Sequence, residues 1–271
     1  MRVNPEERFI RFAISCSILM RVSNAFRAAF FCNSPRREPG GLARLKYFAS
    51  HGHLIANHTA DHLNLNTTPI TQFTKNIDQA DSELRGLQGF RKWFRFPYLH
   101  EGKSAKDVEA IRAHLNSIGY AQGYVTVDTE DWYVDEVLRK KQVSGRKFDE
   151  GRLCQAYARM MSDDAQFFDE MSVKALKRSV KHVILLHETD LNALCLGTLI
   201  QTLKAQNWTF ISPDLAYSDP IAAREPRSST KLNQGRVFAL AVEGGYKGPL
   251  YSKWNEETEI ESELELRRVW Q

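Results

Sequence analysis

Two histidines stand four positions apart, directly after a short apolar run that ends at Ala56. Neutral imidazole is a common ligand of zinc and similar metal ions. In a helical turn this spacing places the rings of His58 and His62 on one face, where both can bind one ion. A metal bound there activates water at neutral pH or polarises a carbonyl group. Taken alone, the pair is also compatible with one surface histidine and one hydrogen-bonded packing histidine.

Three further polar clusters each follow a predicted strand, as the histidine pair does. They are Arg95-Phe96-Pro97-Tyr98, Asp128 to Trp132, and His187. His187 ends an otherwise apolar run, where a polar side chain costs free energy unless it has a partner or a function. The structural alternatives are an ion pair for Arg95, core packing for Tyr98 and Trp132, and a helix cap or turn for Asp128 or Asp131. Four clusters in equivalent positions favour a functional site.

Short apolar runs alternate with helical patterns from about residue 26 to residue 211, which predicts a parallel α/β sheet, often closed as a barrel. In such folds the chemistry collects on the loops that follow the strands. The predicted strands are 27–32, 53–56, 92–96, 120–127, 183–186 and 208–211. The predicted helices are 42–49, 69–87, 104–118, 150–180 and 191–205.

The four clusters resemble, in order, four of the five motifs of the polysaccharide deacetylases of the NodB-homology type, carbohydrate esterase family 4. The matching stretches are His58-Thr59-Ala60-Asp61-His62, Arg95-Phe96-Pro97-Tyr98, Asp128-Thr129-Glu130-Asp131-Trp132 and Ile184-Leu185-Leu186-His187. The resemblance covers about residues 26 to 215 and implies a distorted (β/α) barrel.

The resemblance also implies roles for individual residues. His58 and His62 would bind a divalent metal, usually zinc, with cobalt or a similar ion as an alternative. His187 would be the general acid that protonates the departing amine, and Asp131 would orient or tune it.

Three further residues match family positions near the reacting group. Arg95 would hold the catalytic base in place. The backbone N–H of Tyr98 would help to form the oxyanion site. Trp132 would line the apolar wall beside the general acid.

The family's first motif, Thr-Phe-Asp-Asp-Gly, is absent from the sequence. In the family it supplies the catalytic base and the third metal ligand, yet no aspartate precedes Asp61 here, and residues 1–25 contain only Glu6 and Glu7 as acids. Three explanations compete: a truncated or mis-started deacetylase that lacks its first strand, an inactive glycan-binding homologue, or another carboxylate at the metal. The candidates for that carboxylate are Asp61, Asp128 and Glu38. We favour the first explanation, because the pattern is regular only from Phe26 onward.

The sequence divides into an atypical N-terminal segment (1–25), a deacetylase-like domain (26–217), and a linker with a C-terminal extension (218–271). Residues 237–242 form a strand or short helix, and the charged stretch 256–268 packs on the barrel, contacts a partner or is a solvated helix. The apolar stretch 12–20 is either a degraded signal-peptide core or an irregular arm. Localisation therefore stays open, although the family is often secreted or periplasmic.

The composition limits the kinds of partner that the protein is expected to bind. The net charge of +4 is carried by dispersed basic residues, which argues against nucleic-acid binding. No run approaches the roughly 20 apolar residues of a membrane span. The sequence has no Cys-x-x-Cys pair, so a thiolate zinc site is not expected. The cysteines do not require a disulfide framework, and Cys32 and Cys195 are predicted to be packing residues.

The expected function is metal-dependent hydrolysis of N-acetyl groups on a polysaccharide or oligosaccharide. The chain is expected to be a truncated form of such an enzyme, and it is inactive in its present form if no other residue replaces the missing base. The alternatives are a non-catalytic glycan-binding homologue and a metal-dependent amidase with a small nitrogenous substrate.

Overall fold

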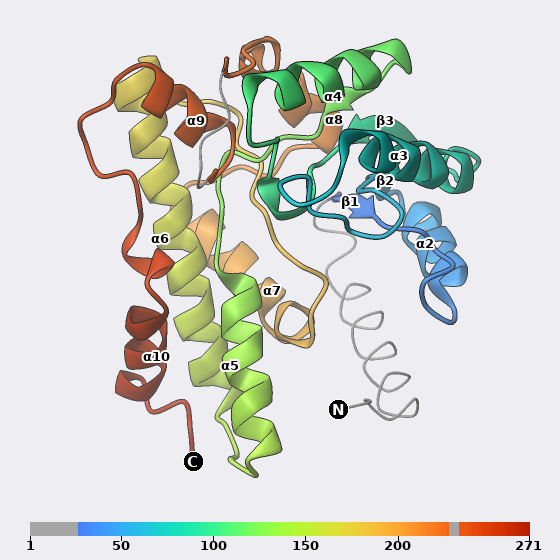
Figure 1. Cartoon of the computed structure of the whole chain (residues 1–271). Coiled ribbons are helices and arrows are strands. Elements are labelled where there is room, and N and C mark those ends of the chain that lie inside the picture. The colour runs from blue at the N-terminus through green and yellow to red at the C-terminus, as the bar shows by residue number, and fades with distance from the viewer. Residues whose placement is uncertain (1–26, 228–232) are drawn as a thin grey trace.

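The computed structural model describes residues 27–227 and 233–271 of the chain. The predicted N-terminal segment 1–25, its apolar stretch 12–20 and residues 228–232 of the predicted linker lie outside the described residues. The described chain forms two sides, one built on a small sheet and the other on long helices (Figure 1).

The sheet contains four parallel strands in sequence order: β1 (Ala29–Cys32), β2 (Leu54–Asn57), β3 (Phe90–Phe94) and β4 (Ala121–Gln122). β2 lies in the middle, and all its residues are buried. The prediction of an α/β fold with a parallel sheet is confirmed. Within the described ranges the sheet is open, with β1 and β4 at its edges.

Three helices connect these strands, as the alternating pattern predicts: α2 (Gly41–Ser50), α3 (Ile70–Leu84) and α4 (Ala105–Ser117). α4 begins with the capping box that the sequence indicates, in which Ser104 and Asp107 each accept from the other's backbone N–H. The apolar face of α3 is buried, with Phe73, Ile77 and Leu84 fully covered. Burial of this apolar stripe fixes the helix against the sheet.

Longer helices make the second side of the molecule. α6 (Glu150–Leu176) packs along α7 (Asp190–Ala205), and the two are joined by a disulfide between Cys154 and Cys195. The sequence predicts Cys195 as a packing residue, and it is indeed fully buried, but it is also bonded to a partner 41 positions away. α5 (Asp131–Val143), which the periodicity does not predict, lies against α7 (Figure 1).

The C-terminal helices α9 (Arg236–Glu243) and α10 (Glu257–Leu266) both pack against α6. Of the two alternatives for residues 237–242, the structure has the helix. Short helical turns complete the described chain: η1 (Pro97–Leu99), α8 (Pro213–Tyr217), η2 (Pro220–Ala223) and η3 (Lys253–Asn255). No helix in the described parts of the chain combines the length and the apolar character needed to cross a membrane.

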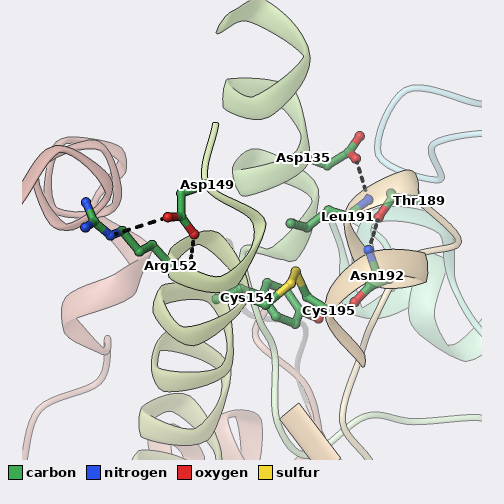
Figure 2. Close-up of a disulfide and its surroundings, with 9 residues drawn as sticks. Asp135, Asp149, Arg152, Cys154, Thr189, Leu191, Asn192 and Cys195 are labelled. Carbon is green, nitrogen blue, oxygen red and sulfur yellow. Dashed lines mark hydrogen bonds and ion pairs between the residues drawn. A yellow bond between two sulfur atoms is a disulfide. The ribbon is translucent and has the colours of Figure 1, made fainter. Parts of the chain in front are cut away.

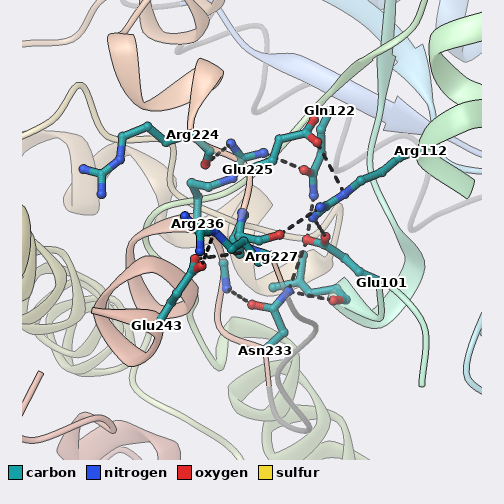
Figure 3. Close-up of polar contacts among 12 residues, drawn as sticks. Glu101, Arg112, Gln122, Arg224, Glu225, Arg227, Asn233, Arg236 and Glu243 are labelled. Carbon is teal, nitrogen blue, oxygen red and sulfur yellow. Dashed lines mark hydrogen bonds and ion pairs between the residues drawn. The ribbon is translucent and has the colours of Figure 1, made fainter. Parts of the chain in front are cut away.

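A polar network joins β4 to the C-terminal part of the chain (Figure 3). The guanidinium of Arg236, which is 2% exposed, donates to Gln122 Oε1 at 2.5 Å and to the Arg224 carbonyl at 2.8 Å. The Gln122 amide in turn donates to Glu101 Oε1 at 2.6 Å. A buried charge is tolerated only when it is hydrogen-bonded in this way.

Three predicted strands are shortened or absent. The predicted strand 120–127 is reduced to Ala121–Gln122, since its next carbonyls bind other groups: Gly123 accepts from Arg95, Tyr124 from Tyr217 and Val125 from the backbone of Arg236. Such acceptors are no longer free for a neighbouring strand.

The predicted strand 183–186 survives only as a single bridge between Ile184 and Val127. The Thr126 hydroxyl accepts from the backbone of Val183 at 2.7 Å and so replaces a ladder bond. Residues 208–211 form no strand, and Trp208 instead packs its ring against His182. Residues 183–186 are only half-buried, as are three of the four residues at 208–211, so these apolar runs predict neither full burial nor strand pairing.

Candidate active site

The histidine pair lies in a tight turn directly after β2. Asn57, the last residue of that strand, is fully buried and accepts the backbone N–H of Thr59 at 2.9 Å through its side chain. Thr59 and His62 both have positive φ angles, of 64° and 56°. This turn, rather than a regular helix, brings the rings of His58 and His62 to 4.8 Å between centroids.

Both imidazoles of the pair are held neutral. The Nδ1–H of His58 donates to the carbonyl oxygen of Arg95 at 2.8 Å, which leaves Nε2 with a free lone pair. Burial, followed by the charge of His62, lowers the pKa of His58 to about 3. Burial also lowers the pKa of His62, with smaller contributions from Arg37 and His187. A neutral ring whose other nitrogen is engaged is oriented as a metal ligand.

The pair fits two positions of a metal site. No group of three or more histidine, cysteine, aspartate or glutamate side chains that could bind a metal occurs in the part of the chain that the structure describes. Among the candidate carboxylates, Asp61 accepts from Asn76 at 2.6 Å and Glu38 from Arg44 at 2.9 Å. A catalytic zinc site usually has three protein ligands.

The third candidate carboxylate, Asp128, lies close enough to His187 for the two charges to interact. Burial, then the charge of Glu130, raises the pKa of Asp128 to about 7. Its position therefore associates it with the acid residue rather than with the histidine pair.

Arg95 follows β3 and is 8% exposed. Its Nε donates to the Gly123 carbonyl at 2.9 Å, its Nη2 donates to the Tyr217 hydroxyl at 3.0 Å, and its guanidinium lies 3.8 Å from the ring centroid of Phe31. Within residues 27–227 and 233–271 we find no carboxylate paired with it. The catalytic base that the resemblance assigns to this arginine is thus not among the described residues.

Tyr98 lies on the turn that follows Arg95, and its side chain is 57% exposed. Its φ is +58° and that of Leu99 is +53°, in the left-handed region that residues with side chains rarely adopt. The Tyr98 ring lies 4.7 Å from the His62 ring between centroids. Backbone strain of this kind concentrates at functional sites.

His187 and Asp131 form a closely bonded pair. Asp131, the first residue of α5, is fully buried and accepts the His187 Nδ1–H at 2.7 Å and the His187 backbone N–H at 2.7 Å. Burial acts to lower the pKa of His187, but the hydrogen bond and charge of Asp131 outweigh it, so that the pKa is raised. The imidazole is half exposed, with 45% of its side chain accessible, and Nε2 is the nitrogen that is left to act on a substrate.

Trp132 follows Asp131 on α5 and is 41% exposed. Its ring contacts that of Tyr133, with centroids 5.6 Å apart. An exposed indole beside the hydrogen-bonded Asp131–His187 pair is suitable for packing against a sugar ring.

The predicted residues from the separate loops influence one another's charges. The positive charge of His187 acts to lower the pKa of both His58 and His62, and that of Arg95 acts on His58 and His187. The structure thus brings the predicted acid, the histidine pair and the arginine within electrostatic range. Sequence reasoning missed Asn192 and Tyr217, which bond to Asp131 and Arg95, since neither belongs to a recognisable spacing.

Comparison with known proteins gives a match to one family model. Residues 22–122 match the sequence model of the polysaccharide deacetylase family, a range that includes His58, His62, Arg95 and Tyr98. No curated protein matches the chain. Over residues 22–122 the chain is thus similar to the polysaccharide deacetylase family.

Solved structures of similar fold include a chitin deacetylase from the fungal pathogen Colletotrichum lindemuthianum, which is 20% identical with a TM-score of 0.52, over 83% of this chain and 85% of that one. They also include the catalytic domain of a peptidoglycan N-acetylglucosamine deacetylase from Eubacterium rectale, 18% identical with a TM-score of 0.51, over 74% of this chain and 82% of that one. At these identities the likeness concerns the fold.

Proposed function

We propose that the chain acts on N-acetylated polysaccharide or oligosaccharide as a metal-dependent deacetylase, releasing acetate and leaving a free amine. One observation carries the proposal: three separate loops bring their side chains together. The rings of His58 and His62 lie 4.8 Å apart between centroids, and His58 donates to the Arg95 carbonyl at 2.8 Å. His187, from the third loop, lies within electrostatic range of both histidines. Unrelated surface histidines have no reason to gather in this way.

In this proposal His58 and His62 hold a divalent metal, with zinc as the first candidate. When bound, such a metal polarises the amide carbonyl and lowers the pKa of water. The pair's contribution is two neutral nitrogen donors, of which that of His58 is kept in place by the bond to the Arg95 carbonyl.

His187 supplies the proton that the reaction needs. As the C–N bond of the amide breaks, the nitrogen takes a proton from Nε2 of the imidazolium and leaves as an amine. Asp131 keeps Nδ1 engaged, so that Nε2 faces the substrate. The exposed rings of Trp132 and Tyr98 would contact the sugar.

A second candidate function is glycan binding without cleavage. It is favoured by one specific feature: the described residues contain neither a carboxylate partner for Arg95 nor a third ligand beside the histidine pair. General base catalysis typically contributes about 10² to 10⁴ in rate, so a chain without a base would bind far better than it hydrolyses.

The deciding experiment measures acetate release from chito-oligosaccharides and from peptidoglycan, with zinc or cobalt added. We expect release by the wild type and none by His58→Ala. His114→Ala is the matched control, because this histidine pairs with Asp78 on the surface. Retained oligosaccharide binding with no acetate release by the wild type would refute the deacetylase and support the binding module.

A further inference from the structure

The Asp131–His187 pair is attached to a second layer of buried contacts that no motif includes. Asn192, in the first turn of α7, is 7% exposed. Its amide nitrogen donates to Asp131 Oδ2 at 2.5 Å and to the His187 carbonyl at 2.8 Å. One side chain therefore holds both members of the pair.

The orientation of the Asn192 amide is itself fixed. An amide can point either way, and its hydrogen-bond partners decide which end donates. The Tyr157 hydroxyl, fully buried on α6, donates to Asn192 Oδ1. Burial raises the pKa of Tyr157 well above its ordinary value, so this hydroxyl keeps its proton. The amide nitrogen is consequently turned toward Asp131.

The register of the two helices decides whether Tyr157 reaches Asn192. Cys154 precedes Tyr157 by three residues on α6, and Cys195 follows Asn192 by three residues on α7. Residues three apart lie on the same face of a helix. The disulfide and the Tyr157–Asn192 hydrogen bond are therefore two neighbouring links between the same two faces.

Figure 2 shows the disulfide beside Asn192, with Asp135 and Thr189 holding the start of α7. Asp135 accepts the backbone N–H of Leu191 at 3.2 Å, and the Thr189 hydroxyl accepts that of Asn192 at 3.2 Å. The first turn of α7 is thus fixed to α5 as well as to α6.

We propose that Asn192 is a positioning residue of the acid site, which fixes His187 in its Nδ1–H form through Asp131, and that Tyr157 and the Cys154–Cys195 disulfide set its orientation. A positioning shell of this kind determines how accurately the acting group is aligned. The catalytic consequence rests on the proposed function, whereas the alignment of His187 does not.

The test measures the protonation of the His187 imidazole directly. In full-length protein with ¹⁵N-labelled histidine, NMR reports which ring nitrogen carries the proton, and His187→Gln assigns the signal. At a pH above the pKa of His187, where the ring is neutral, we expect a single Nδ1–H form in the wild type and a mixture of both forms in Asn192→Ala. Tyr157→Phe and the double variant Cys154→Ser/Cys195→Ser should show the same change to a smaller degree.

The matched control is Leu199→Ala, which removes a buried side chain from the same helix without touching the network. It should lower the melting temperature and leave the His187 form unchanged. If Asn192→Ala keeps the wild-type signal, or if Leu199→Ala loses it equally, Asn192 is merely structural. Should Asn192→Ala not fold, Tyr157→Phe decides, since it deletes only a hydroxyl.

Activity provides a separate readout. If the wild type releases acetate, Asn192→Ala should lose roughly tenfold or more in kcat with KM unchanged, as expected for misalignment. A reduction in proportion to lost stability, matched by Leu199→Ala, would contradict the positioning role. If the wild type releases no acetate, the proposed function fails, and the NMR result still decides on Asn192.

Discussion

His58 and His187 are both histidines near one site, yet their surroundings shift their pKa values in opposite directions. His58 donates to a neutral carbonyl and has positive neighbours, so that its pKa is lowered to about 3. His187 donates to a buried carboxylate, and its pKa is raised. Pairs of groups whose pKa values are driven apart in this way are typical of divided catalytic roles. The two environments would suit the metal ligand and the general acid of the proposed function.

Replacing Asp131 with Asn tests the second of these environments. The substitution keeps the shape but removes the negative charge, so burial should prevail and lower the pKa of His187. The protonated acid exists only below that pKa, and it should therefore be lost at a lower pH than in the wild type. An NMR pH titration of the His187 ring measures the shift.

Asp214→Asn is the control for this titration, because Asp214 is 52% exposed and pairs with Arg91. It should leave the His187 titration in place. An unchanged titration in Asp131→Asn would show that the carboxylate does not set the pKa of this histidine.

At the scale of elements, the loops after β2 and β3 give the site its shape. Seven non-glycine residues among those described have positive φ, and four of them, Thr59, His62, Tyr98 and Leu99, fall in these two loops. Each such residue costs roughly 1–3 kcal/mol and persists only where the surroundings impose it. The buried side chain of Asn57 is one such constraint, since it accepts from Thr59 and donates to the Ile77 carbonyl at 3.0 Å.

The sequence predicts the elements of the sheet side well, because periodicity and capping act locally. The Ser104–Asp107 capping box and the apolar stripe of α3 are examples. It fails where the outcome depends on distant partners. Strand pairing at 183–186 is limited by the hydroxyl of Thr126, and Cys195 finds its partner 41 residues earlier.

The same distinction applies to the site. Family motifs predict the positions of the histidine pair, Arg95 and the Asp131–His187 pair. They do not predict Asn192, since its contact with Asp131 spans 61 positions and has no sequence spacing of its own.

Gly123 offers a test of how β1 and the end of β4 fit together. A Cβ atom at this position would clash with a ring carbon of Phe31. The Arg95 guanidinium, which lies 3.8 Å from the centroid of the same ring, restricts the movement of Phe31 away from the clash. Gly123→Ala should therefore destabilise the protein by roughly 1–3 kcal/mol, the usual cost of overpacking. Urea unfolding followed by circular dichroism measures the change.

Gly197 is the matched control, since it lies inside α7 and a Cβ there meets nothing within 4 Å. Gly197→Ala should stabilise the protein by about 0.5–1 kcal/mol, because alanine is the better helix former. Equal effects of the two substitutions would contradict the packing at Gly123.

At the scale of the whole molecule, the C-terminal helices belong to the same core as the long helices of the second side. Val237 and Phe238 of α9 and Ile260 and Leu264 of α10 join a single apolar cluster with α6 and α7. Polar contacts support this packing, as Arg159 of α6 donates to Glu263 Oε1 at 3.1 Å. We propose that residues 233–271, although they follow the predicted linker, fold together with the deacetylase-like domain.

Two leucines on α10 separate this proposal from that of a loosely attached tail. Leu264 is fully buried, whereas Leu266 is 76% exposed. Leu264→Ala should cost roughly 2–5 kcal/mol of unfolding free energy, as for other buried leucines, and Leu266→Ala less than about 0.5 kcal/mol. Because α10 shares its core with α6, the loss should lower the midpoint of one cooperative transition, seen alike by circular dichroism and by tryptophan fluorescence. A separate early transition in Leu264→Ala, with the main midpoint unchanged, would show that the C-terminal helices unfold independently of the site.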